Sequence, residues 1–285
     1  QTARREKRKR SEIFIKRRVR MAADGRQGGG MKKKIAIITG ASSGIGQEFA
    51  FQLDEIMHEL DEIWLIARRR ERLEELAKVL ETGCRTIAMD VTEERDMELF
   101  RNILATEDVS VRMLVNCAGY GLMGRFDGIS IEEQLGMLEV NCKALTRMTY
   151  ECIPYMCKNG RIIQLASSAA FVPQKNFAVY AAAKSYVLSF SRALREELRE
   201  RDIWVTAVCP GPVETEFFDI AEKYASTLAV KKLTMVPPQK VVRDALRDSY
   251  HKKALSICSL PMKAFGILTK TVPHGWILSV MGILK

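Results

Sequence analysis

Tyr180 and Lys184 lie four positions apart in the stretch VYAAAK (179–184), whose other residues are alanine and valine. On a helix, positions four apart share a face, so the lysine ammonium can reach the neighbourhood of the tyrosine hydroxyl. A nearby cation favours phenolate and is expected to lower the tyrosine pKa from its ordinary value of about 10. Such a tyrosine could pass a proton in either direction. The spacing alone is weak evidence, because the chain holds 7 tyrosines and chance often produces such a pair.

A glycine-rich stretch lies near the start of the apolar part of the chain. In IAIITGASSGIGQEFAF (35–51), Gly40, Gly44 and Gly46 have the spacing TGxxxGxG. Glycines there permit positive φ and let backbone N–H groups approach a pyrophosphate, whose charge then lies at a helix N-terminus. The spacing differs from the GxGxxG fingerprint, but the mechanism is shared. The stretch indicates a dinucleotide site, although a tight strand-to-helix turn would also explain the glycines.

Arg68, Arg69 and Arg70 follow the second apolar run. Dinucleotide-binding folds commonly carry an acid at this place, which binds the ribose 2′-hydroxyl. An acid would repel a 2′-phosphate, whereas guanidinium groups bind phosphate through charge-assisted hydrogen bonds. The arginines therefore favour NADP(H) over NAD(H), with NAD(H) as a second usable cofactor. A solvated first turn of the helix that begins here is the alternative.

Short runs rich in β-branched residues alternate with longer segments of helical period from residue 33 onward. This alternation predicts an α/β fold with a parallel sheet and crossover helices. Strands are predicted at 34–39, 62–67, 85–89, 111–116, 160–166 and 203–209. The clearest helical segments are 46–60, 70–81, 94–105, 179–202 and 238–253.

Further motifs follow the glycine-rich stretch in a fixed order. Together they read Thr39-Gly40-x-x-x-Gly44-x-Gly46, Asp90-Val91, NCAG at 116–119, Asn141, Ser167, Tyr180-x-x-x-Lys184 and PGPVET at 210–215. With these motifs in this order, residues 33–255 strongly resemble the short-chain dehydrogenase/reductase family. The resemblance implies a Rossmann-type, doubly wound parallel sheet of about seven strands with helices on both faces. It also implies an oxidoreductase that acts on CH–OH groups with NAD(P). Cys117 departs from the asparagine that the family often has there, which puts little in doubt.

The resemblance assigns a role to each matching residue. Tyr180 is implied to be the general acid and base, Ser167 a hydrogen-bond donor to the substrate oxygen, and Lys184 the partner of Tyr180 and of the nicotinamide ribose. Asn141 is implied to hold a water that connects Lys184 to solvent. Ser168 is the alternative to Ser167, but the family places this serine about thirteen residues before the tyrosine, which favours Ser167. Besides Tyr180 and Lys184, the residues expected to bind the cofactor are Gly40, Ser42, Ser43, Gly44, Ile45, Gly46, Arg68, Arg69, Asp90, Val91, Asn116, Ala118, Gly119, Pro210, Gly211, Val213 and Thr215.

Charge is distributed unevenly along the chain. The net charge is +10, and residues 1–30 hold 11 of the 45 Lys and Arg residues but 3 of the 35 Asp and Glu residues. We interpret residues 1–30 as a basic, disordered leader or extension and residues 31–285 as a single domain. A membrane-surface or nucleic-acid role for the basic arm is the alternative function, but no nucleic-acid partner is expected. Seven scattered cysteines and three separated histidines suggest no metal site and indicate reduced thiols in a cytoplasmic protein.

The expected substrate is a small, hydrophobic carbonyl compound or alcohol. Apolar and aromatic residues gather at 119–128, after the fourth predicted strand, at 169–179, and around 212–236, the expected substrate cover. The same pattern would accept a sterol, a fatty acyl group, a sugar or a xenobiotic ketone. A dinucleotide-sensing protein without turnover is the rival function, but that class usually lacks the Tyr/Lys pair.

The apolar tail, 259–285, is interrupted by Lys270 and Pro273. A transmembrane span needs about 20 uninterrupted apolar residues, so none is expected. Core packing, a substrate cover or a subunit contact is favoured over contact with a membrane surface. The family resemblance also implies a homodimer or homotetramer, formed through two long helices near 141–158 and 178–201.

Overall fold

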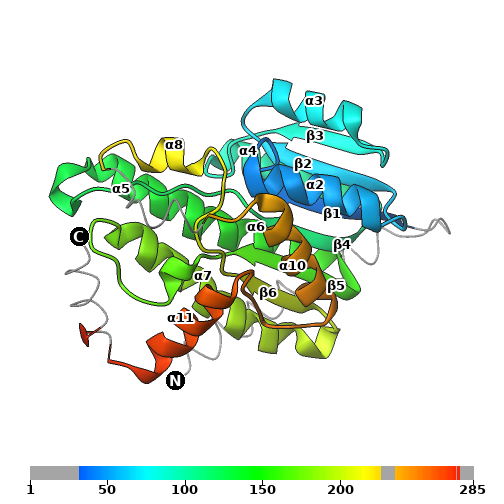
Figure 1. The fold of residues 1–285 in the computed structure, drawn as a ribbon. Helices are drawn as coiled ribbons and strands as arrows, with labels where there is room; N and C mark the ends of the chain where they lie inside the picture. The colour runs from blue at the N-terminus through cyan, green and yellow to red at the C-terminus, as the bar shows by residue number, and fades with distance from the viewer. Residues whose placement is uncertain (1–31, 226–234, 274, 277–285) are drawn as a thin grey trace, which may run out of the picture.

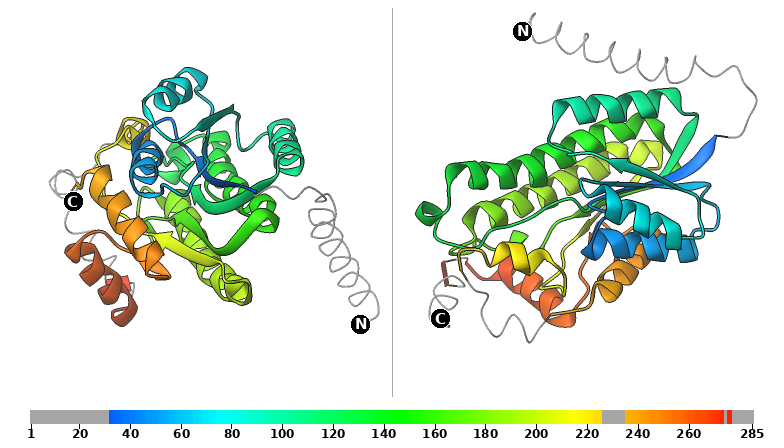
Figure 2. Two further views of the ribbon diagram at one scale, coloured as in Figure 1. Left: turned by 90° about the vertical axis from the view of Figure 1, so that its right-hand side faces the viewer. Right: turned by 90° about the horizontal axis from the view of Figure 1, so that it is seen from above.

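The computed structural model describes residues 32–225, 235–273 and 275–276 (Figure 1). The basic segment 1–30 and residues 226–234 of the expected substrate cover lie outside these residues. Figure 2 shows the described chain as a sheet with helices on both sides.

Seven parallel strands form the sheet, in the order β3-β2-β1-β4-β5-β6-β7. The predicted doubly wound α/β fold is therefore confirmed. Because β1 pairs with both β2 and β4, the chain switches direction across the sheet at β1, and ligands of such folds bind at the carboxyl ends of the strands there. The strands are β1 (Lys33–Thr39), β2 (Glu62–Ala67), β3 (Cys84–Ala88), β4 (Val109–Asn116), β5 (Met156–Leu165), β6 (Trp204–Val208) and β7 (Leu255–Ser256).

Helices cover both faces because the strands are apolar on both faces. In β1, Ile35 and Ile37 pack into one core cluster, and Ala36 and Ile38 pack into the other. The alternation follows the two-residue period of a strand, and the continuous apolar run is typical of a parallel sheet buried on both sides. One face is covered by α2 (Gly44–Ile56), α3 (Arg70–Val79) and α10 (Pro238–Tyr250), and the other by α4 (Glu94–Thr106), α6 (Leu145–Cys152) and α7 (Ala178–Leu198).

The helix expected near 141–158 differs from the observed one. The helical run begins earlier, with α5 (Ile131–Leu138), continues through a π-helical turn, η2 (Glu139–Ala144), and ends with α6 at Cys152. Pro154 stands in the short 3₁₀ turn that follows, and β5 begins at Met156. Proline lacks the N–H of a continuing helix, so the helix stops where the strand must start. The second long helix is confirmed, as α7 followed by a 3₁₀ turn over Arg199–Arg201.

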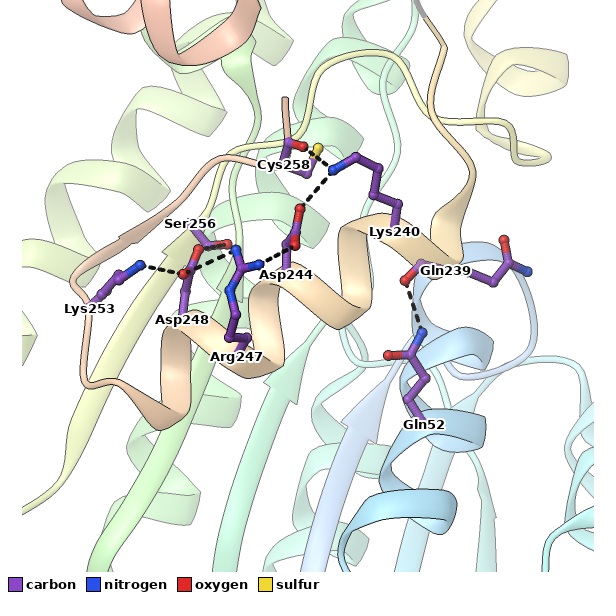
Figure 3. Close-up of polar contacts among 9 residues, drawn as sticks. All are labelled: Gln52, Gln239, Lys240, Asp244, Arg247, Asp248, Lys253, Ser256 and Cys258. Carbon is purple, nitrogen blue, oxygen red and sulfur yellow. Dashed lines mark hydrogen bonds and ion pairs between the residues drawn. The ribbon is translucent and has the colours of Figure 1, made fainter. Parts of the chain in front are cut away.

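The C-terminal part of the described chain is tied to α10 by buried carboxylates (Figure 3). Asp248 accepts hydrogen bonds from Ser256 and Lys253, each at 2.8 Å. Lys240 donates to Asp244 at 3.1 Å and to the Cys258 carbonyl at 2.7 Å. These contacts fix β7 and the entry to the next helix, α11 (Leu260–Thr271).

The first half of the apolar tail is this helix, α11, and it faces a cavity. Met262 and Phe265 line a cavity of about 1110 Å³, a position that fits the substrate cover, one of the three roles favoured for the tail. Within the described ranges, no helix is both long enough and apolar enough to cross a bilayer.

Candidate active site

A cavity of about 1110 Å³ lies at the carboxyl ends of the strands, where the chain switches direction. It extends from the turn between β1 and α2 to α7, α8 (Phe217–Ala221) and α11. Of the predicted site residues, those that line it are Gly40, Ser42, Ser43, Gly44, Ile45, Gly46, Arg68, Arg69, Asp90, Val91, Ala118, Gly119, Ser167, Tyr180, Lys184, Pro210, Gly211, Val213 and Thr215. Asn116 and Asn141 do not line it.

The turn between β1 and α2 has the backbone geometry that its glycines predict. Gly40 and Gly44 have φ of 69° and 54°, which side-chain-bearing residues rarely adopt. A Cβ on Gly46 would collide with the carbonyl group of Gly40 and lie 2.7 Å from its carbon. Ser43, the N-cap of α2, makes no side-chain cap, so the first N–H groups of α2 can receive an anion. The turn therefore fits a pyrophosphate.

The segment after β6 closes over this turn. A Cβ on Gly44 would lie 3.1 Å from Cγ2 of Thr215, so Thr215 packs directly on the glycine-rich turn. Val213 forms an isolated parallel bridge with Val236, which holds the segment in place. The predicted stretch PGPVET thus borders the cavity beside the start of α2.

Arg69 is the guanidinium held against the turn. Its Nη2 donates to Ser42 and Ser43 at 3.0 and 2.8 Å, and its Nε also donates to Ser42. Arg68 lies beside it, with 78% of its side chain exposed and Nη1 at 3.8 Å from Asp90. Two guanidinium groups and two hydroxyls thus surround one end of the cavity, a donor set that suits a phosphate.

Asn116 supports the cavity floor from below. It is buried, and its Nδ2 donates to Thr149 and Gln164 at 3.0 Å each. The floor itself is made by Ala118 and Gly119, and the Ala118 N–H donates to Thr39. The Asn116 Oδ1 is buried without a hydrogen-bond partner among the described residues. The Asn116 side chain thus lies beneath the floor, and its part in cofactor binding stays a prediction.

Tyr180 and Lys184 lie one turn apart on α7, as predicted, and both are buried. The Lys184 Nζ is 5.6 Å from the centre of the Tyr180 ring and donates to the Leu165 carbonyl at 2.8 Å. Ser167 interacts with Tyr180 and lowers its pKa, while Ser168 begins a 3₁₀ turn. The geometry thus brings Ser167, of the two serines, to the tyrosine.

Asn141 reaches the same place from the π-helical turn η2, a feature often found at functional sites. Its Nδ2 donates to the Tyr120 carbonyl at 2.7 Å, and its Oδ1 is buried without a partner. A Cβ on Gly119 would collide with this Oδ1 and lie 3.4 Å from the Lys184 Nζ. The glycine therefore leaves room between the amide and the ammonium.

The electrostatics of the pair differ from the prediction. Burial raises the pKa of Tyr180, and the interaction with Ser167 opposes this only in part. Burial also lowers the pKa of Lys184 to about 8. The predicted lowering of the tyrosine pKa by Lys184 is thus wrong for the chain by itself, because desolvation disfavours both charged forms.

The buried ammonium predicts a pH-dependent stability. Unfolded Lys184 has its ordinary pKa of 10.5, so between pH 8 and 10.5 the unfolded chain binds more protons and stability rises with pH. Lys184→Met removes this dependence. From pH 8 to 10.5, the free energy of unfolding of the unchanged protein should therefore rise by about 3 kcal/mol relative to that of Lys184→Met. Urea unfolding at several pH values measures it, since other titrating groups are common to both proteins. Parallel pH profiles would contradict it.

Two contacts of the Tyr180 ring come from stretches expected to shape the substrate region. Phe177 stacks on the ring at 4.3 Å, and a Cβ on Gly121 would lie 2.5 Å from its Cδ2. Glu216, by contrast, was not predicted as a site residue. Glu216 pairs with two arginines beside the glycine-rich turn. No motif includes Glu216, but it directly follows the quoted motif PGPVET.

Known proteins resemble this chain over most of its length. The family model described as short chain dehydrogenase matches residues 34–224. An uncharacterized oxidoreductase of Staphylococcus epidermidis is 33% identical over 187 residues, which cover 65% of this chain and 80% of that protein.

Two solved structures share the fold. A short-chain dehydrogenase from Sphingobium yanoikuyae in complex with NADPH is 26% identical with a TM-score of 0.72, covering 87% of this chain and 95% of that one. A short chain dehydrogenase/reductase from Burkholderia phymatum in complex with NAD is 20% identical with a TM-score of 0.73, covering 83% and 92%, which bears on the fold alone. Since the family model spans more than half of the chain, this chain belongs to the short-chain dehydrogenase/reductase family of oxidoreductases, enzymes that act on CH–OH groups with NAD(P).

Proposed function

We propose that the chain is an NADP(H)-dependent oxidoreductase that interconverts a carbonyl group and a secondary alcohol on a small, hydrophobic substrate. One observation carries the proposal: Tyr180, Ser167 and Lys184 meet in the same cavity as the glycine-rich turn. A proton donor and a dinucleotide cradle in one cavity are what a hydride transfer to a carbonyl requires.

Four residues divide the chemistry. The nicotinamide, when bound, supplies or accepts the hydride, and its oxidised form adds a positive charge that favours phenolate. Tyr180 protonates the substrate oxygen during reduction and removes that proton during oxidation. Ser167 donates a hydrogen bond to the developing alkoxide and does not act as a nucleophile. Lys184 returns the proton to Tyr180. Asn141 binds, through its unpartnered Oδ1, a water that connects Lys184 to solvent.

The preference for NADP(H) rests on Arg68 and Arg69, and the NADPH complex of the Sphingobium protein supports it. Arg69→Ala should lower kcat/KM for NADPH by about 10- to 100-fold, the value of one charged hydrogen-bonding group, and that for NADH by less than about threefold. Steady-state assays with both cofactors measure this. Arg70→Ala is the matched control, because Arg70 points along α3 toward Glu74. Equal losses with both cofactors, or an unchanged protein that prefers NADH, would refute the preference.

The side chains around Tyr180, at the end of the cavity away from the glycine-rich turn, support a small, hydrophobic substrate. Apolar and aromatic side chains line the cavity there, namely Tyr120, Met123, Phe177, Phe217, Phe218, Met262 and Phe265. We assign the segment 212–236, with α8, as the substrate cover, and α11 as a second wall.

Assembly and location are also proposed. Exposed apolar side chains on the helical run 131–152 and on α7, such as Leu135, Leu138 and Tyr186, support a homodimer or homotetramer through these helices. The seven cysteines are free thiols, which supports a cytoplasmic protein. We assign residues 31–285 to one domain and 1–30 to a basic extension.

A further inference from the structure

The carboxylate of Glu216 pairs with two arginines beside the glycine-rich turn. Glu216 accepts from Arg69 Nη1 at 3.0 Å and from Arg72 Nη1 at 2.5 Å. Arg69 contacts the hydroxyls of Ser42 and Ser43 at the same time. The carboxylate is thus the anion that neutralises part of the positive charge of this cluster.

The position of Glu216 joins two sides of the cavity. Glu216 directly precedes α8, the assigned cover, whereas Arg69 directly precedes α3, and the two residues are 147 positions apart. Glu216 lines the large cavity together with Arg69. It also lines a second cavity of about 560 Å³ together with Arg72, which does not line the first. Because Arg69 and Arg72 line different cavities, the carboxylate can break its contact with Arg69 and keep its contact with Arg72.

We propose that Glu216 is a specificity-determining residue, whose carboxylate competes with the 2′-phosphate of NADP(H) for Arg69. The inference rests on the proposed function, in which Arg69 binds that phosphate. A phosphate offers three acceptor oxygens and a higher charge, so it can displace a carboxylate, whereas a 2′-hydroxyl cannot. Glu216 therefore weakens binding of the phosphorylated cofactor and leaves NAD(H) unaffected.

The ion pairs are of the kind that a ligand can displace. The side chains of Glu216, Arg69 and Arg72 are 42–44% exposed, and pairs of such exposure contribute little to stability. A purely structural latch for α8 is the competing explanation. It predicts that loss of the carboxylate lowers the melting temperature and fails to improve phosphate binding.

Adenosine 2′,5′-bisphosphate and 5′-AMP, which differ only by the 2′-phosphate, test the inference without turnover. Calorimetric titration of Glu216→Gln should give about three- to tenfold tighter binding of the bisphosphate, the value of one or two displaced exposed ion pairs, with 5′-AMP unchanged within about twofold. Glu214→Gln is the control, because it removes an equal charge from the same segment and leaves both Glu216 contacts in place. Its affinity for either ligand should match that of the unchanged protein.

Three outcomes overturn the competition. They are unchanged or weaker bisphosphate binding by Glu216→Gln, an equal gain for 5′-AMP, and an equal gain from Glu214→Gln. If the unchanged protein still prefers the bisphosphate in these cases, the proposed cofactor preference stands and only the role of Glu216 is wrong. If neither the unchanged protein nor either variant binds the bisphosphate more tightly than 5′-AMP, both the inference and the cofactor preference fail.

Discussion

Replacing Tyr180 by Phe is expected to lower kcat by about 10²- to 10⁴-fold, the usual contribution of a positioned proton donor. The phenyl ring can keep its stacking on Phe177 and its packing against Gly121, so the fold and the cavity should persist. The loss should therefore appear in kcat, while the Kd for NADPH changes by less than about twofold. Steady-state kinetics with a turned-over ketone, together with a fluorescence titration of NADPH, measures both quantities.

Tyr186→Phe is the matched control for this substitution. Tyr186 lies on the same helix, but its hydroxyl contacts Thr146 and its ring stacks on Phe190, away from the residues that line the cavity. The control should keep kcat within about twofold of the unchanged protein. A Tyr180→Phe variant that retains more than about a tenth of the activity would refute the acid–base role of the hydroxyl.

Replacing Gly46 by Ala is expected to destabilise the protein by about 1–3 kcal/mol, because the new Cβ overpacks the turn. The new Cβ collides with the Gly40 carbonyl group, whose carbon lies 2.7 Å away. Gly40 has a positive φ, so its backbone has little freedom to move out of the way. Relief requires α2 to move away from the turn, which withdraws its N–H groups from a pyrophosphate. Cofactor affinity should fall by about tenfold or more. Urea unfolding and NADPH titration measure the two effects.

Gly128→Ala provides the comparison for this prediction. A Cβ on Gly128 would lie 3.8 Å from the Arg125 Cβ, an ordinary contact, and far in sequence from the turn. Its unfolding free energy should change by less than about 1 kcal/mol and its NADPH affinity not at all. Equal effects of both substitutions would show that the glycine-rich turn has no special constraint.

The sheet could be predicted because its strands are long, apolar and β-branched. Six strands were located from such runs, whereas β7 was not, since its two residues leave no pattern of their own. The helix expected at 141–158 extends too far, because its last residues form the start of β5. Pro154 was the available signal for the end of that helix.

The site could be predicted only where a motif names the residue. The Tyr180 and Lys184 pair follows from helical spacing, but the direction of their pKa shifts depends on burial, which spacing does not report. The π-helical turn at Asn141 and the contact between Glu216 and Arg69 also depend on three-dimensional packing. A sequence shows neither the burial of a phenol nor a contact across 147 positions.

Absorbance of the reduced nicotinamide, followed while the purified protein is mixed with NADPH and a panel of hydrophobic ketones, tests the central claim most directly. At least one ketone should cause NADPH to be consumed, with formation of the matching secondary alcohol, and NADH should be used less well. A protein that binds NADPH but turns over none of these ketones, nor the corresponding alcohols with NADP⁺, would contradict the proposed activity.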